Sequence, residues 1–109
     1  MSDQVDRLIA HYQKALLIKS NNAEVYIYLA EVYYKKGQLD EAIAAYNCAI
    51  DLKPDAYKAY YRLGKILQEL QRWQEAIYCY LQVIYCYQEC FHVEQILVDS
   101  YYKLIVSAQ

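Results

Sequence analysis

Residues that build loops are scarce in this chain. Its 109 residues include two glycines and one proline, so long turns and irregular segments have little to be made from. An excess of charge of one sign is also missing. The formal net charge of -2 gives no broad basic field that would attract a nucleic acid or an anionic membrane. We therefore expect helices joined by short turns, with neither a nucleic acid nor a membrane as partner.

Long apolar runs are missing as well. No segment approaches the roughly 18 consecutive apolar residues that a membrane-spanning helix needs. The first residues, MSDQVDRLIAHYQ, carry charges where a signal peptide would be apolar. The sequence therefore predicts a cytoplasmic protein.

Motifs that carry chemistry are equally scarce. His11 and His92 are the only histidines, and neither lies in a nucleophile or metalloprotease motif. Gly37 and Gly64 stand far apart in the chain, so no glycine-rich loop is present to hold a phosphate. We expect no catalytic residue, no cofactor and no enzymatic activity, and we interpret His11 as a solvated edge residue.

The cysteines do not have the spacing of a metal site. Cys79, Cys86 and Cys90 lie seven and four residues apart on one expected helix, and His92 follows closely. Zinc ligands usually come in pairs from turns, whereas two residues seven apart on a helix are separated by about 10 Å along its axis. The same separation disfavours a disulfide within that helix. We expect no metal, and buried reduced thiols that include Cys48.

Tyrosine and an internal repeat are what the chain has in abundance. There are fifteen tyrosines, which pack as aromatics and tolerate a wet edge, so we expect them in repeat cores and half-buried edges.

The sequence also repeats itself at a fixed spacing, which is typical of stacked helical units. When the chain is laid on itself in one constant shift, Tyr26, Leu29, Glu41, Ala42, Ile43, Tyr46 and Ile50 fall on Tyr60, Leu63, Glu75, Ala76, Ile77, Tyr80 and Ile84.

Each full unit is predicted to be a pair of helices. In the unit at residues 23–56, Gly37 ends the first helix in a left-handed conformation, and Asp40 opens the second as an N-cap or first-turn acid. Pro54 ends the second helix. Gly64, in the next unit, is a packing residue where a larger side chain would push the paired helix away. Four residues of the first helix lie on one face, because three of them follow Tyr26 by three, four and seven positions: Tyr26, Leu29, Ala30 and Tyr33.

This arrangement resembles the tetratricopeptide repeat family, whose pattern is an aromatic, Leu, Gly and Tyr, then Ala, an aromatic and Pro. Gln88 stands at the place of the second Pro. The resemblance implies an all-α fold of antiparallel helix-turn-helix repeats stacked in a right-handed superhelix. The matching residues are Tyr26, Leu29, Ala30, Tyr33, Ala42, Tyr46 and Pro54 in the first unit, and Tyr60, Leu63, Gly64, Leu67, Ala76 and Tyr80 in the second.

The same repeat register extends to both ends of the chain. Residues 3–22 contain the second helix of a partial repeat, residues 23–56 and 57–90 are full repeats, and residues 91–108 form a first helix that lacks its second. We expect about six helices in a single domain at residues 1–109. The last two helices could fuse or break between Gln88 and Phe91, and we favour a break.

The resemblance implies a function in binding. In that family the first helices line a concave groove that holds a protein or peptide ligand. We expect an extended peptide to lay side chains against Tyr34 and Tyr61. The corresponding groove positions here are Glu24, Ile27, Glu31, Tyr34 and Lys35, then Lys58, Tyr61, Lys65 and Gln68, with Arg62 one turn from Lys58.

The pair Lys58 and Arg62 raises an alternative. In relatives that hold the C-terminal carboxylates of chaperones, such a pair completes a clamp with Lys and Asn from upstream helices. Ile27, Tyr28 and Glu31 stand on the nearest upstream first helix instead, so the clamp looks incomplete here. A second alternative is a regulatory segment of a larger enzyme.

The last helix is apolar around most of its circumference. Repeat arrays normally end in a helix with a polar outer face, so something should cover this one. We expect a homo-oligomer, either head to tail or two-fold, unless the chain continues into a further helix. The partner's identity and the symmetry stay open. The expected self-association surface comprises Val93, Leu97, Val98, Tyr101, Tyr102 and Ile105.

Overall fold

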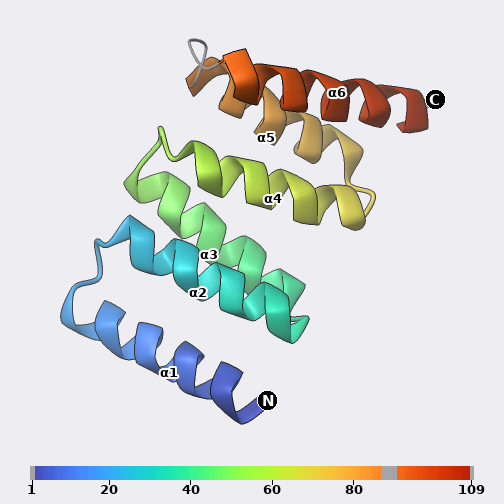
Figure 1. The fold of residues 1–109 in the computed structure, drawn as a ribbon. Coiled ribbons are helices and arrows are strands. Elements are labelled where there is room, and N and C mark those ends of the chain that lie inside the picture. The colour runs from blue at the N-terminus through green and yellow to red at the C-terminus, as the bar shows by residue number, and fades with distance from the viewer. Residues whose placement is uncertain (1, 87–90, 109) are drawn as a thin grey trace. The chain divides into compact units, whose positions relative to one another are not determined.

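The part of the chain that the structure describes consists of helices joined by short turns. The computed structural model describes the backbone of residues 2–86 and 91–108, and the side chains of residues 3–86 and 98–108. Six helices are present, as predicted: α1 (Ser2–Ile18), α2 (Ala23–Lys36), α3 (Leu39–Leu52), α4 (Tyr57–Glu69), α5 (Trp73–Cys86) and α6 (Phe91–Ala108) (Figure 1). They form two compact units, Met1–Pro54 and Asp55–Gln109. The prediction of a single domain, and that of a right-handed superhelix, stay predictions.

In the first unit α2 packs along both α1 and α3 (Figure 1). Ile9 of α1 is buried with Leu29 and Val32 of α2, and four further side chains pack against this cluster: Val5, Tyr12, Leu16 and Tyr33. Four residues of α3 are also buried: Ala42, Ala45, Tyr46 and Ala49. Because three of these four are alanines, α3 can lie close to its neighbour.

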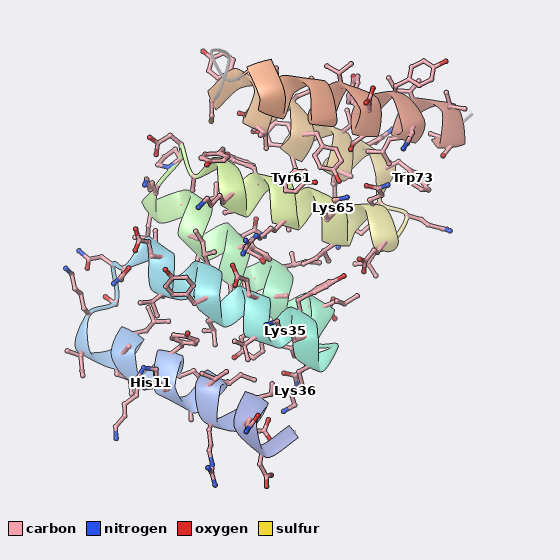
Figure 2. All side chains as sticks on the ribbon, in the orientation of Figure 1. His11, Lys35, Lys36, Tyr61, Lys65 and Trp73 are labelled. Atoms are coloured by element: carbon pink, nitrogen blue, oxygen red, sulfur yellow. The ribbon has the colours of Figure 1, made fainter. Side chains whose placement is uncertain are left out.

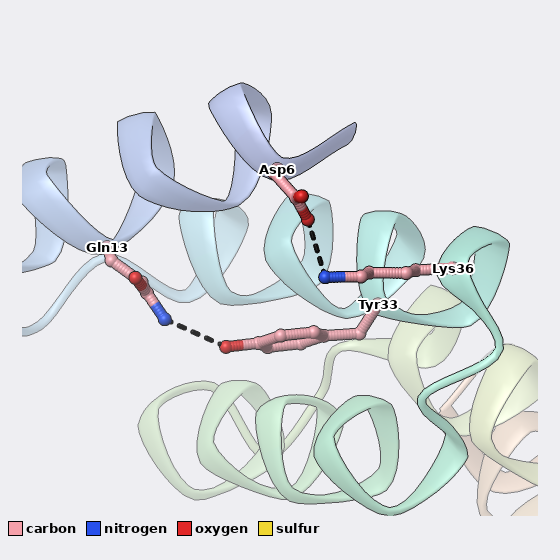
Figure 3. Close-up of polar contacts among 4 residues, drawn as sticks. All are labelled: Asp6, Gln13, Tyr33 and Lys36. Carbon is pink, nitrogen blue, oxygen red and sulfur yellow. Dashed lines mark hydrogen bonds and ion pairs between the residues drawn. The ribbon is translucent and has the colours of Figure 1, made fainter. Parts of the chain in front are cut away.

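Two polar contacts also join α1 to α2 (Figure 3). Lys36 forms an ion pair with Asp6, and Gln13 Nε2 donates a hydrogen bond of 2.9 Å to the Tyr33 hydroxyl. Both contacts are at the solvent edge, so each stabilises the pair of helices by well under about 1 kcal/mol. The apolar cluster therefore holds α1 in place.

In the second unit α5 packs along both α4 and α6 (Figure 1). The core includes Tyr80 and Val83 of α5 and Leu104 of α6, and the side chain of each is almost completely buried. Trp73, the one tryptophan of the chain, is half-buried at the start of α5. The packing of α6 on α5 makes them two separate helices, while residues 87–90 between them lie outside the described part.

Helix ends follow local chemistry. Asn22 caps α2, because its side-chain oxygen accepts hydrogen bonds from the backbone N–H groups of Glu24 and Val25 at 3.1 and 3.3 Å. Gly37 ends α2 with a φ of 85°, as predicted. Asp40 lies in the first turn of α3, and Pro54 follows the end of that helix at Leu52.

The close approach predicted at Gly64 is present. A Cβ added to Gly64 of α4 would lie 2.8 Å from Cε1 of the Tyr80 ring on α5. Real Cβ atoms do not approach other atoms that closely, so the absence of a side chain on α4 allows the buried ring to fit. At the same register position in the first unit, Ala30 is fully buried.

Candidate functional site

The predicted groove residues of the first unit all lie on α2. Glu24, Tyr34 and Lys35 are exposed, and Ile27 and Glu31 are half-buried. Tyr34 lies near enough to the buried Tyr46 of α3 to act on it electrostatically. Burial first, and then Tyr34, raises the pKa of Tyr46 to about 12. The α2 face therefore presents an exposed aromatic ring among charges of both signs.

The corresponding residues of the second unit lie on α4, and two of them are in direct contact. The Lys65 ammonium lies 5.6 Å from the centroid of the Tyr61 ring, a cation–π geometry (Figure 2). Lys58 and Lys65 are exposed, while Arg62 and Gln68 are half-buried. This face of α4 therefore carries three cations around a tyrosine.

Tyr80 of α5 supports this face from below. Its ring centroid lies 6.0 Å from that of Tyr61, and its hydroxyl donates a hydrogen bond of 2.8 Å to Gln68 Oε1. Burial first, and then Tyr61 and Cys79, raises the pKa of Tyr80 above its usual range, so the hydroxyl stays a donor at neutral pH. The contacts hold Tyr61 and Gln68 in fixed positions. We call Tyr61, Lys65, Gln68 and Tyr80 the α4–α5 cluster.

Tyr80 was not among the groove residues predicted from the sequence. Its register position marks it as a core residue, and that is correct for the ring. The available signal is its hydroxyl, because a buried tyrosine usually finds a hydrogen-bond partner, and Gln68 lies on the helix that the repeat pairs with α5. The particular partner depends on side-chain geometry that the spacing does not contain.

Three of the four cysteines are described, and one of them overturns a prediction. Cys48 is exposed on α3, whereas we expected it to be buried. It lies on the face of α3 that points away from the alanine-rich interior stripe, so its helical position is the reason. Cys79 is buried as predicted, and burial raises the pKa of its thiol to about 11. Cys86 is half-buried, and Cys90 lies outside the described residues.

Other candidate sites behave as ordinary surface. His11 is exposed, with its ring against Tyr12 at a centroid separation of 5.4 Å (Figure 2 labels His11). In the described part of the chain no group of three or more His, Cys, Asp or Glu residues is placed to hold a metal ion. Within the same part, none of the helices combines the length and the apolar character that crossing a membrane requires.

The predicted self-association surface lies on α6, and four of its residues are described. Val98 and Tyr102 are exposed by 51% and 68%, which leaves much of both side chains without cover. Tyr101 and Ile105 are half-buried. The side chains of Val93 and Leu97 lie outside the described residues. Val106, which was not on the predicted surface, is 53% exposed and extends the same stripe by one turn.

Family models match most of the chain. A model described as TPR repeat matches residues 30–71, and two models described as tetratricopeptide repeat match residues 4–47 and 58–87. The three matches together run from the first helix to the end of α5.

Individual proteins with similar sequence or fold are also known. The Protein SGT1 homolog of Oryza sativa subsp. japonica is 37% identical over 65 residues, which are 60% of this chain and 18% of that protein. This chain therefore matches less than a fifth of that relative's length.

Two solved structures have the same fold. One is the first TPR of Spaghetti (RPAP3) bound to the HSP90 peptide SRMEEVD, with a TM-score of 0.83, 22% identity and coverage of 98% of this chain and 82% of that one. The other is the type III secretion translocator chaperone SycD of Yersinia enterocolitica, with a TM-score of 0.87, 11% identity and coverage of 98% and 76%. At these identities both show the fold alone.

Proposed function

This chain belongs to the tetratricopeptide repeat family, and from that premise we propose that it is a non-catalytic protein-interaction module. Its ligand is a protein segment in extended conformation. The outward face of α2 is the proposed contact in the first unit, and the outward face of α4 is the proposed contact in the second. Its place of action is the cytoplasm, where thiols such as Cys48 stay reduced. A helical repeat is suited to this role because its stacked units present a broad surface without a catalytic cleft.

The observation that carries the proposal is the α4–α5 cluster. Lys65 lies over Tyr61, and Tyr80 fixes both Tyr61 and Gln68 from below. A surface held in this way loses little side-chain entropy when a ligand arrives, which favours affinity. Tyr61 offers an aromatic face to an apolar side chain, and Lys58 and Lys65 offer donors to a carboxylate. The ligand expected at α4 therefore combines acidic and apolar residues.

A peptide array tests this proposal. The full chain is applied to immobilised peptides that combine acidic and apolar residues, and the affinities of the peptides that bind are then measured by fluorescence anisotropy. We expect Tyr61→Ala and Lys65→Ala each to weaken binding about tenfold, equivalent to about 1.4 kcal/mol. Tyr78→Ala is the matched control, because Tyr78 is an exposed tyrosine on α5 and lies outside the α4–α5 cluster. Peptides that bind equally well to all three variants would count against the proposal.

A second candidate is a chaperone-tail adaptor. Lys58 and Arg62 stand one turn apart on α4, and a structure of the same fold holds the HSP90 peptide SRMEEVD. The probe is therefore labelled SRMEEVD, with the C-terminally amidated peptide as control. This candidate requires binding that is lost on amidation and in Lys58→Ala. Equal binding of the two peptides would exclude a carboxylate grip.

Self-association is the last part of the proposal. Val98, Tyr102 and Val106 lie four residues apart on α6 and form an exposed apolar stripe. An exposed apolar stripe of this kind is suited to contact another chain. The oligomer expected is built from copies of this chain.

A further inference from the structure

In the described part of the chain, α1 and α6 each have an apolar side chain exposed where complete repeats bury a small residue. α1 occupies the register of a second helix, and Leu8 on it is 44% exposed where its equivalents Ala42 and Ala76 are fully buried. α6 occupies the register of a first helix, and Val98 is 51% exposed where Ala30 is fully buried. Two arrangements would cover α6 with a second copy: α1 of that copy, or its α6.

Complete repeats in this chain pair their helices through small residues. Gly64 of α4 admits the Tyr80 ring so closely that an added Cβ would lie 2.8 Å from it. Ala30 holds the same position on α2, and Ala42 and Ala76 are fully buried on the second helices. Close approach at these positions sets the distance between the two helices. A repeat rebuilt from two copies would have to reproduce it.

The two ends of the chain lack these small residues. Val98 stands on α6 at the position of Ala30 and Gly64, and Leu8 stands on α1 at the position of Ala42 and Ala76. In a repeat rebuilt from α6 of one copy and α1 of another, Val98 would face Tyr12, the equivalent of Tyr80. Ala30 is fully buried at this position in the first unit, so an alanine fits there, but a valine adds two methyl groups and would force the ring or the helix away. The head-to-tail arrangement therefore fits poorly.

The exposed face of α6 is instead complementary to itself. Beside the stripe of Val98, Tyr102 and Val106 lie Asp99 and Lys103, both exposed and one turn apart. When two copies of one helix pack antiparallel about a two-fold axis, the same flank of each helix meets the other in reverse order. Asp99 of each copy then lies close to Lys103 of the other. In a parallel two-fold arrangement the two flanks that carry Asp99 and Lys103 would lie on opposite sides of the interface, and this pairing would not form.

We propose that the chain forms a two-fold homodimer in which α6 packs antiparallel against α6 of a second copy, through Val98, Tyr102 and Val106, with Asp99 facing Lys103 across the axis. This inference rests on the self-association part of the proposed function and gives it a geometry. The dimer is closed, because the stripe on each copy is covered by the same stripe on the other. α1 takes no part in it.

Light scattering coupled to size exclusion tests the geometry at several concentrations of the full chain. We expect a mass that rises to that of a dimer and then stays constant. Tyr102→Glu and Val106→Glu should each give a monomer, with helix content checked by circular dichroism. Leu8→Glu, the matched control on α1, should remain dimeric. A strictly monomeric chain would overturn the proposal. So would a mass that keeps rising with concentration beyond that of a dimer and that is lower in Leu8→Glu.

A charge exchange between copies tests the antiparallel pairing. Asp99→Lys puts two cations on each α6, and Lys103→Asp puts two carboxylates there, so each variant alone should dimerise at least tenfold more weakly. An equimolar mixture should recover dimers, because each Lys-bearing flank then meets an acidic one. An ion pair within one helix, or a contact between α6 and α1, predicts no recovery on mixing. Absence of recovery would therefore reject the pairing.

The dimer and the peptide site can fail independently. Tyr102 lies on α6, outside the α4–α5 cluster, so the monomeric Tyr102→Glu variant should bind peptides with unchanged affinity per chain. If the chain proves monomeric while Tyr61→Ala still weakens peptide binding, the dimer inference fails and the binding function stands.

Discussion

At the scale of single residues, the pairing of Gly64 with Tyr80 determines how closely α4 and α5 approach. The ring of Tyr80 is fully buried, while its hydroxyl donates to Gln68. One side chain therefore contributes both to the core and to the exposed face of α4. This explains why tyrosine serves here better than phenylalanine, which could fill the same space but would leave Gln68 without that donor.

Gly64→Val should destabilise the chain. The new side chain would collide with the Tyr80 ring, which is enclosed by the core and held by its hydrogen bond to Gln68. We expect a loss of about 1–3 kcal/mol in the free energy of unfolding, measured by urea denaturation. Ala44→Val is the control, because Ala44 is exposed on α3, and only the helix propensity of valine, about 0.5 kcal/mol, should be felt there. Equal losses in the two variants would contradict the collision.

Alkaline pH should destabilise the fold. Burial raises the pKa of Cys79 to about 11 and that of Tyr46 to about 12, so the folded chain keeps protons that the unfolded chain releases from about pH 9 to 10 upward. The two groups therefore contribute their full stabilisation below pH 9. As the pH rises to 12, the free energy of unfolding falls by about 1.4 kcal/mol per pH unit for each group between its pKa in the unfolded chain and its pKa in the folded chain. Urea midpoints between pH 7 and 11 measure the decline. Tyr46→Phe should make it shallower, and midpoints that stay constant up to pH 11 would exclude this linkage.

At the scale of elements, the two first helices end in the same motif with different residues. After α2, Gly37 donates to the Tyr34 carbonyl and Gln38 to the Tyr33 carbonyl; after α4, Gln71 donates to the Gln68 carbonyl and Arg72 to the Leu67 carbonyl. Gln71 has a φ of 60°, a left-handed conformation that is costly for a residue with a side chain. Gly37 could be predicted from its residue type. Gln71 could be found only by its position one repeat after Gly37.

Gln71→Gly should stabilise the chain. Glycine removes the strain of the left-handed conformation, but it also has greater conformational entropy in the unfolded state. When this entropic cost is subtracted, we expect a net gain of about 0.5–1 kcal/mol in the free energy of unfolding. The reverse change at the equivalent position, Gly37→Gln, should cost a similar amount. Urea midpoints of the two variants measure both effects. A Gln71→Gly variant that is less stable than the unchanged chain would mean that the glutamine side chain makes a contact that outweighs the strain.

At the scale of the whole molecule, periodicity explains what the sequence could predict. The repeat period, together with the positions of Gly37 and Pro54, predicts six helices and their order, because each depends on residue type at a fixed spacing. The exposure of Cys48 and the contacts of Tyr80 were not predicted, because they depend on the rotation of a helix and on side-chain rotamers. The groove residues were placed on α2 and α4 by register, and their joint role in binding stays a prediction.

Terminal helices should exchange their amide hydrogens faster than internal ones. Within its unit α1 packs along α2, whereas α2 has two neighbours, and in repeat proteins stability comes from such nearest-neighbour interfaces. Hydrogen exchange followed by mass spectrometry should show lower protection in α1 than in α2. If α6 is covered in a dimer, its protection should fall in Tyr102→Glu. Equal protection of α1 and α2 would mean that the first unit opens in a single step.

The location of Trp73 has a practical consequence. It is the chain's one tryptophan, half-buried at the start of α5, and the first unit contains none. Its emission is therefore an intrinsic optical reporter of the second unit, while far-ultraviolet circular dichroism records helices in both. Denaturation curves from the two signals should coincide if the units unfold cooperatively and separate if they do not. Trp73 is thus an intrinsic fluorophore that reports whether the two units unfold together or separately.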